Sequence, residues 1–89
     1  MPRDREAAYA KLPDDGVVRI LRERRRGGTM SVVAGLRPHE LDEVAKTLRR
    51  HCGTGGTAKN GVVEIQGDHR EKIAAWFAAA GRKVKLAGG

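Results

Sequence analysis

Cysteine and aromatic residues are scarce in this sequence, and long apolar runs are absent from it. Cys52 is the one cysteine among 89 residues, and Tyr9, Trp76 and Phe77 are the aromatic side chains. One cysteine forms no disulfide within the chain, which argues against a disulfide-stapled secreted protein. No stretch reaches the roughly 18 apolar residues of a membrane span, and residues 1–6 lead into no apolar segment typical of a signal peptide. We therefore expect a soluble, cytoplasmic protein with no membrane partner.

The chain has the length of one domain, and its positive charge is unevenly distributed. Residues 1–15 contain three basic and four acidic side chains, a net charge of −1, whereas the whole chain carries +7. The remaining residues therefore carry +8. Because residues 13–16 (Pro-Asp-Asp-Gly) form a turn signal, we expect residues 1–15 to be a flexible leader. Residues 16–89 then form a single domain, which we expect to be monomeric.

Hydrophobic periodicity predicts the order strand, strand, helix, strand, strand, helix, strand. Apolar residues at helical spacing form one stripe that ends before Gly53, a typical helix stop. Asn60-Gly61 is the strongest two-residue hairpin signal, and Asp68 with Glu71 fits an N-terminal capping box. The expected strands cover residues 17–22, 29–33, 57–59, 62–66 and 84–86. The helical stripes are Leu41, Val44, Ala45, Leu48 and Cys52 in the first helix, and Ile73, Trp76, Phe77 and Ala80 in the second.

This order predicts an α+β fold. Apart from the first strand it matches the split βαβ core of ferredoxin-like domains. We expect a two-layer sandwich of ββαββαβ order, with both helices packed on one face of a mixed sheet.

The sequence offers little support for an enzyme or a metal site. Cys52 follows His51 directly, and successive helix positions point about 100° apart, so the pair is poorly placed for nucleophilic catalysis. The other histidines, His39 and His69, lie far apart in the sequence. The glycines of residues 53–61 close a helix and open a strand, the reverse of a phosphate-binding loop, and Val62 stands where such a loop needs lysine. We expect no catalytic activity, no cofactor and no metal.

The basic residues are more informative, because a turn does not require arginine. Residues 24–26 are three arginines in the link between the first two strands, and others lie on the exposed side of the first helix. A clustered excess of arginine favours a phosphate-backbone partner, although a solvated run of charge is the simpler alternative. With no spare aromatic for base stacking, backbone and shape recognition of structured RNA is favoured. The basic candidates are Arg19, Arg22, Arg24, Arg25, Arg26, Lys46, Arg49 and Arg50, with Lys59 beside the second hairpin turn.

Two segments carry a family resemblance. Residues 52–57 (CGTGGT) and 61–70 (GVVEIQGDHR) resemble the signature of the eukaryotic translation initiation factor 1 family, which has a SUI-type domain. Residues 83–89 (KVKLAGG) are similar to its bacterial YciH-like branch. The resemblance covers residues 16–89, and its Gln-Gly-Asp-x-Arg element is more specific than any basic run.

The resemblance implies a protein that binds the small ribosomal subunit near the P site and modulates the selection of initiator tRNA and start codon. It assigns the rRNA-facing loop to Arg24, Arg25, Arg26, Gly27 and Gly28, and the basic positions of the first helix to Lys46, Arg49 and Arg50. It assigns the loop that faces initiator tRNA to Lys59, Asn60 and Gly61, and the family signature to Gly67, Asp68 and Arg70. In the bacterial branch the effect on initiation can be inhibitory.

Other functions stay open at this point. A general structured-RNA-binding module or RNA chaperone has the same surface without a preference for the ribosome. A protein-interaction domain with a solvated basic face is a further alternative, and a small nuclease is a more distant one.

Overall fold

The computed structural model describes residues 15–87, which contain a five-stranded sheet and two α-helices. The elements are β1 (Val18–Arg25), β2 (Gly28–Ala34), a 3-10 turn (Pro38–Glu40), α2 (Leu41–Cys52), β3 (Gly56–Lys59), β4 (Val62–Gln66), α3 (Arg70–Ala79) and β5 (Val84–Ala87). Residues 1–14 of the expected leader lie outside the described residues. Its last residue, Asp15, binds the Arg19 side chain of β1.

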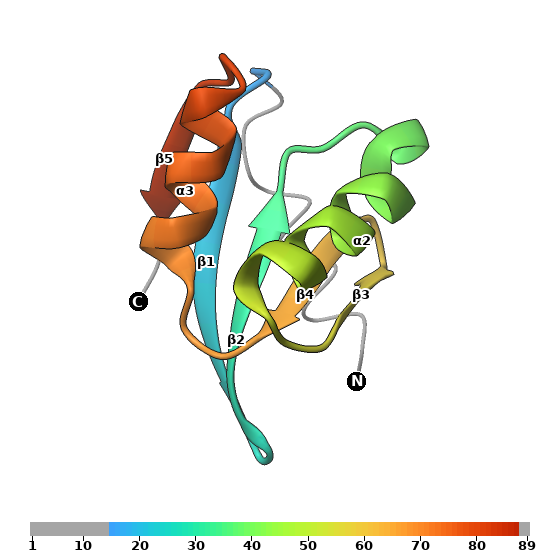
Figure 1. Ribbon diagram of the computed structural model, residues 1–89, viewed down its shortest axis with the longest axis vertical. Coiled ribbons are helices and arrows are strands. Elements are labelled where there is room, and N and C mark those ends of the chain that lie inside the picture. Colours follow the sequence, from blue (N-terminus) through green and yellow to red (C-terminus); the bar gives the residue numbers. More distant parts are fainter. Residues whose placement is uncertain (1–14, 88–89) are drawn as a thin grey trace.

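The strands lie in the order β3-β4-β2-β1-β5, and both helices cover one face of the sheet (Figure 1). All neighbouring pairs are antiparallel except β1 and β5, which are parallel. Strands β2 and β3 are therefore parallel, with β4 between them, and α2 connects them. This is a split βαβ unit, and the predicted two-layer α+β sandwich is confirmed.

The first strand lies inside the sheet, a position that the ferredoxin-like comparison did not specify. Strand β1 pairs with β2 on one side and with β5 on the other. It thereby separates β5 from β2, which would be neighbours in a ferredoxin-like sheet. Because the β1–β2 link is short, β1 pairs with β2. The edge of β1 that faces away from β2 stays unpaired, and β5 pairs with it.

The β1–β2 hairpin is longer than the sequence predicts. Pairing continues to Arg25 opposite Gly28, which leaves Arg26 and Gly27 as the turn. Two of the three consecutive arginines thus belong to a strand and point to opposite faces of the sheet. Arg24 shares the helix-covered face with Ile20, and Arg25 lies on the other face.

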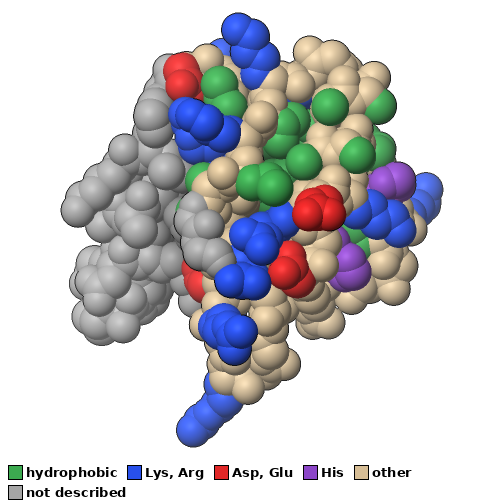
Figure 2. Space-filling model, turned by 90° about the vertical axis from the view of Figure 1, so that its left-hand side faces the viewer, with side chains coloured by type: hydrophobic (Ala, Val, Ile, Leu, Met, Phe, Trp, Pro, Cys, Tyr) green, Lys and Arg blue, Asp and Glu red, His purple; other side chains and the backbone are tan. Residues whose placement is uncertain are grey.

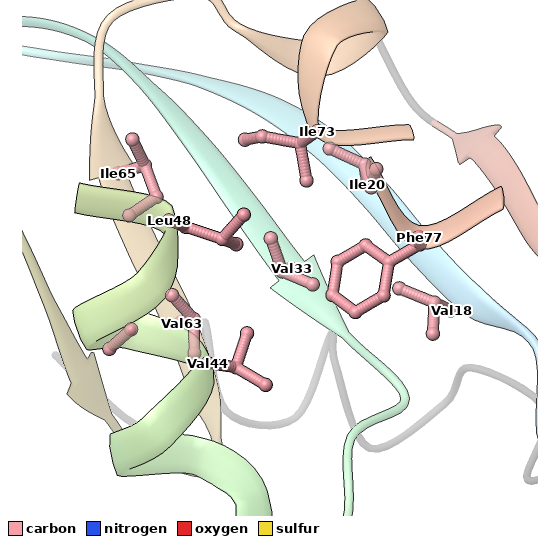
Figure 3. Close-up of a cluster of buried hydrophobic side chains, with 10 residues drawn as sticks. Val18, Ile20, Val33, Val44, Leu48, Val63, Ile65, Ile73 and Phe77 are labelled. Carbon is pink, nitrogen blue, oxygen red and sulfur yellow. The ribbon is translucent and has the colours of Figure 1, made fainter. Parts of the chain in front are cut away.

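The core fills the space between the sheet and both helices (Figure 3). Leu48 of α2 and Ile73 and Phe77 of α3 are almost wholly buried against the β-branched side chains of the central strands. The largest group of buried apolar residues consists of Val18, Ile20, Val33, Val44, Ala45, Leu48, Val63, Ile65, Ile73 and Phe77. The predicted stripe of the first helix therefore lies on the core, with Leu41 and Cys52 half-buried at its edges.

The predicted stripe of the second helix is only partly correct. Ile73 and Phe77 are buried, but Trp76 is half-buried and packs edge-on against Phe77, with ring centroids 4.9 Å apart. Ala80 is exposed and lies beyond the last residue of α3. The helix ends one residue early because the N–H groups of Ala80 and Gly81 bond to carbonyl groups in a tightened last turn.

The predicted end of the first helix is confirmed. Gly53 follows α2 with a φ of 65°, the left-handed conformation that glycine tolerates best, and its N–H donates to the carbonyl of Arg49. Half-burial of the neighbouring Cys52 raises the pKa of its thiol, which fits a packing role rather than a reactive one.

An ion pair joins the connection between β2 and α2 to the connection between α3 and β5. Arg82, which follows α3, donates to both carboxylate oxygens of Glu40 over 2.9 and 3.3 Å. Glu40 also accepts the Arg37 backbone N–H at 2.7 Å. These donors hold the pKa of Glu40 below its usual range, with Arg82 as the main cause.

Replacement of Leu48 by alanine tests the packing of α2. We expect Leu48→Ala to lower the free energy of unfolding by about 2–5 kcal/mol, since the side chain is fully buried and leaves a cavity. Glu43→Ala, at an exposed position of the same helix, should change it by less than about 0.5 kcal/mol. Urea denaturation measures both, and equal effects would contradict the described packing.

The Glu40–Arg82 pair makes stability depend on pH. Because the folded-state pKa of Glu40 is depressed, its contribution is complete above the ordinary glutamate pKa of about 4.3 and disappears as the pH falls through the depressed value. Glu40→Gln should therefore destabilise the protein at pH 7, and the gap from wild type should close in acid. Thermal melts over a pH series measure this gap, and a pH-independent gap would show that the carboxylate charge is not involved.

Candidate nucleic-acid interface

The strand directions place the two hairpin turns at opposite ends of the sheet. Strand β4 is antiparallel to β2, so the turn at Asn60-Gly61 lies at the end where β2 finishes. The turn at Arg26-Gly27 lies at the other end, to which α2 also runs (Figure 1). We call this the basic end and define it by Arg24 and Arg26 of the hairpin, Arg49 and Arg50 of α2, and the turn of residues 67–70.

Four of the predicted RNA-binding cations have the properties of phosphate ligands. Arg24, Arg26, Lys46 and Arg50 are exposed, and none of them forms an ion pair with another described residue. Figure 2 shows basic side chains along the hairpin as far as its protruding tip. Their guanidinium and ammonium groups are therefore available to an anion from solvent.

Arg25 differs from its two neighbours because its side chain is engaged within the protein. It donates from both terminal nitrogens to Glu64 of β4, at 3.0 and 2.7 Å, and from Nε to Glu23 at 2.6 Å. Glu64 is only 3% exposed. These hydrogen bonds, chiefly those to Glu64, raise the pKa of Arg25 further above its usual value.

The remaining three candidates also have internal contacts. Arg19 makes a bidentate pair with Asp15, which lowers the pKa of that carboxyl to about 2, and it lies opposite Ala34, away from the basic end. The Nη1 atom of Arg22 lies 3.6 Å from the Oδ2 atom of Asp68. Arg49 donates to the Gly56 carbonyl at 3.2 Å and so helps to position the start of β3.

The segment from Gly67 to Arg70 is a tight turn built around a buried hydroxyl. The Gly67 N–H donates to the carbonyl of Thr29, and the Ser31 hydroxyl donates to the Gly67 carbonyl at 2.7 Å. The same hydroxyl accepts the His69 N–H at 2.9 Å. Gly67 has a φ of 96°, and a Cβ there would lie 2.7 Å from the His69 ring. The signature glycine is therefore required by the backbone.

The predicted capping box of Asp68 and Glu71 is wrong. Helix α3 begins at Arg70 with His69 in the capping position, and no side chain caps it. The Asp68 carboxylate instead accepts from Arg70 Nε at 3.1 Å and lies close to Arg22. The Arg70 hydrogen bond is the main reason that the pKa of Asp68 is lowered. A carboxylate within reach of two guanidinium groups forms charge-assisted contacts in preference to a neutral cap.

The predicted second hairpin is confirmed, but it lies apart from the basic end. Asn60 and Gly61 have φ values of 53° and 79°, as a type I′ turn requires. Lys59, the last residue of the edge strand β3, is exposed, as are Asn60 and Gly61 of the turn that follows. The structure thus brings together the hairpin, the end of α2 and the signature turn, but places Arg19 and the Lys59–Gly61 turn elsewhere.

Sequence reasoning missed two residues that organise this end. Ser31 and Glu64 are the buried polar or charged side chains among the described residues. The sequence places Ser31 in a strand that alternates apolar with hydroxyl residues, and Glu64 in a strand that is also part of the family resemblance, but it assigns no contact to either side chain. Their signal in the sequence is a polar residue between apolar neighbours in a predicted strand, which indicates a buried hydrogen-bonding partner but does not identify it.

The described residues contain no group of three or more His, Cys, Asp or Glu side chains that could hold a metal ion. No helix within residues 15–87 is long and apolar enough to cross a membrane.

Comparison with known protein families identifies the family to which this chain belongs. The model of the family described as translation initiation factor SUI1 matches residues 14–83, which include the hairpin, both helices and the signature turn. The chain belongs to this family. The SUI1 family is a family of translation initiation factors rather than of enzymes.

Relatives in bacteria and archaea match over most of their length. An uncharacterised protein of Haemophilus influenzae is 40% identical over 91 residues, which cover 98% of this chain and 86% of the relative. The YciH protein of Escherichia coli is 44% identical over 88 residues, with coverages of 94% and 82%. A protein translation factor SUI1 homolog of Pyrococcus abyssi is 36% identical over 83 residues, with coverages of 90% and 85%. The similarity therefore extends to both the YciH and the SUI1 homologs.

Replacement of Ser31 by alanine tests the signature turn. Ser31→Ala leaves the Gly67 carbonyl and the His69 N–H without their buried partner, so we expect a loss of about 1–3 kcal/mol in the free energy of unfolding. Thr57→Ala removes an exposed hydroxyl and should cost less than about 0.5 kcal/mol. Chemical denaturation measures both. If Ser31→Ala were as stable as wild type, the hydroxyl would not hold the turn.

Proposed function

We propose that this protein binds the small ribosomal subunit near the P site through rRNA contacts and modulates the selection of initiator tRNA and start codon. Membership of the SUI1 family supports a role as a translation initiation factor-like protein. The observation that carries the finer proposal is the basic end. Exposed arginines that form no ion pair with another described residue protrude there on a hairpin, beside the turn that carries the family signature.

The chemistry of this end suits a phosphate backbone. Arg24 and Arg26 lie on a narrow hairpin, and Arg50 lies at the end of α2 on the same side of the molecule. Planar guanidinium groups bind phosphate in a bidentate manner, and each phosphate they neutralise releases counterions from the RNA. Such contacts provide affinity but no sequence information, so specificity comes from the shape of the folded rRNA.

Selection of the start codon then requires no chemical reaction. A factor that binds one ribosomal state more tightly than another shifts the balance between the states by its difference in binding free energy. A difference of about 1.4 kcal/mol changes that balance tenfold. The same mechanism promotes or inhibits initiation, according to which state is favoured, and it operates in the cytoplasm.

The Lys59–Gly61 turn is assigned to initiator tRNA in this proposal. It lies at the opposite end of the sheet from the hairpin tip, so a molecule anchored on rRNA by its basic end directs this turn away from the anchor. Only Asn60 and Gly61 lie between the strands β3 and β4, so the turn has little bulk of its own. Its effect on tRNA therefore depends on the orientation of the whole domain.

The salt dependence of binding tests the proposal. Purified small subunits, large subunits and a structured control RNA are pelleted or captured with the protein over a salt series. We expect saturable binding of about one copy to the small subunit, and a loss of affinity in the variant Arg24→Ala/Arg26→Ala. The plot of log affinity against log salt should become shallower, its slope decreasing in magnitude by about 1.5. The variant loses two phosphate contacts, and each contributes about 0.7–0.9 to the slope.

The matched control is Lys83→Ala/Lys85→Ala, which removes the same charge at exposed positions on and beside β5. It should bind almost as wild type does. Equal retention on all RNAs would reduce the function to that of a general RNA-binding module or RNA chaperone. Binding that is insensitive to salt would instead indicate a protein partner.

A further inference from the structure

Glu64 places a carboxylate in the interior of a small basic protein. It lies in the middle of β4, opposite Val32 of β2 and Thr57 of β3, and it is 3% exposed. An ionised carboxylate at such a position is costly unless a cation is bound to it with good geometry. Arg25 supplies this partner through two parallel N–H···O bonds, the strongest form of arginine–carboxylate contact.

The position of Arg25 in the chain gives this contact a consequence for the hairpin. Arg25 is the last residue of β1, directly before the turn at Arg26-Gly27. Its fork on Glu64 therefore ties the hairpin tip to β4, a strand that does not pair with β1. Glu23, two residues earlier on the same strand, accepts the third hydrogen bond of the guanidinium at 2.6 Å.

We propose that Arg25 is a positioning residue that holds the hairpin tip in place for Arg24 and Arg26 and does not itself contact RNA. The inference rests on the proposed function. Alternation along β1 sends Arg24 to the opposite face, and Arg26 lies in the turn, so both stay exposed while Arg25 is engaged.

Two physical arguments favour this division of roles. Three of the five guanidinium N–H groups of Arg25 are already used within the protein, and a move to phosphate would take the bidentate partner away from a buried carboxylate. The two glycines that follow Arg26 also give the tip many accessible conformations. An anchor at Arg25, two residues before the first of these glycines, reduces the entropy that RNA binding must overcome.

Glu64→Gln separates positioning from simple electrostatics. The change keeps the size of the side chain and makes the protein more positive by one charge. Charge alone then predicts unchanged or tighter binding to RNA, whereas loss of the anchor predicts weaker binding. We expect about tenfold weaker binding to small subunits with an unchanged salt slope, because Arg24 and Arg26 still make their contacts once bound.

The 89-residue protein and six variants form the experiment, namely Glu64→Gln, the four variants described next and Arg25→Ala. Glu43→Gln carries the same charge change at an exposed position of α2 and should bind as wild type does. Arg25→Lys keeps the positive charge but loses the fork, so it should weaken binding as Glu64→Gln does. Arg24→Ala should reduce the salt slope. Leu48→Ala lowers stability in the core, away from the hairpin, and should leave affinity unchanged at temperatures where it is folded.

Backbone amide relaxation of residues 24–28 in the free protein gives a second readout, independent of the ribosome. We expect lower order at the tip in Glu64→Gln and Arg25→Lys than in wild type or Glu43→Gln. The proposal is overturned if these two variants keep both tip order and affinity, or if Arg25→Ala reduces the salt slope as Arg24→Ala does. If wild type does not bind small subunits, the proposed function fails, and the relaxation data still decide whether the pair orders the tip.

Discussion

Alternation of side chains along β1 is the constraint on which the arrangement of this protein depends. Val18, Ile20 and Arg24 face the helices, whereas Arg19 and Arg25 face the other side of the sheet. The side chains on the helix-covered face supply part of the core and one exposed arginine. Those on the other face supply the partners of Asp15 and Glu64. A shift of one residue in this strand would bury the cations and expose the core. The strand therefore determines at once how the domain packs and which charges remain available.

Much of the fold could be predicted because its elements are local. The stripe of α2, the stop at Gly53 and the turn at Asn60-Gly61 each depend on a few neighbouring residues, and each is present in the structure. The position of β1 between β2 and β5 could not be predicted, since it depends on which strand edges remain open after the hairpin forms.

The candidate site was predictable in composition but not in geometry. The sequence identified a basic surface, but three consecutive arginines look alike until strand pairing separates Arg24 from Arg25. Capping by Asp68 was a reasonable expectation from spacing. It is wrong because His69 occupies the capping position of α3, and the Asp68 carboxylate contacts the guanidinium groups of Arg70 and Arg22 instead. Long-range pairs such as Arg25 and Glu64 leave no periodic signal in a single sequence.

The parallel pairing of β1 with β5 has a consequence for synthesis of the chain. The two strands that share this ladder come from opposite ends of the described sequence, and Val18 also donates to the Lys83 carbonyl. While the polypeptide is still growing, the outer edge of β1 therefore has no native partner until residues 84–87 have been made. Contacts between such distant segments slow folding, and an open edge invites association with other strands. The sheet therefore cannot be completed before these residues have left the ribosome and reached β1.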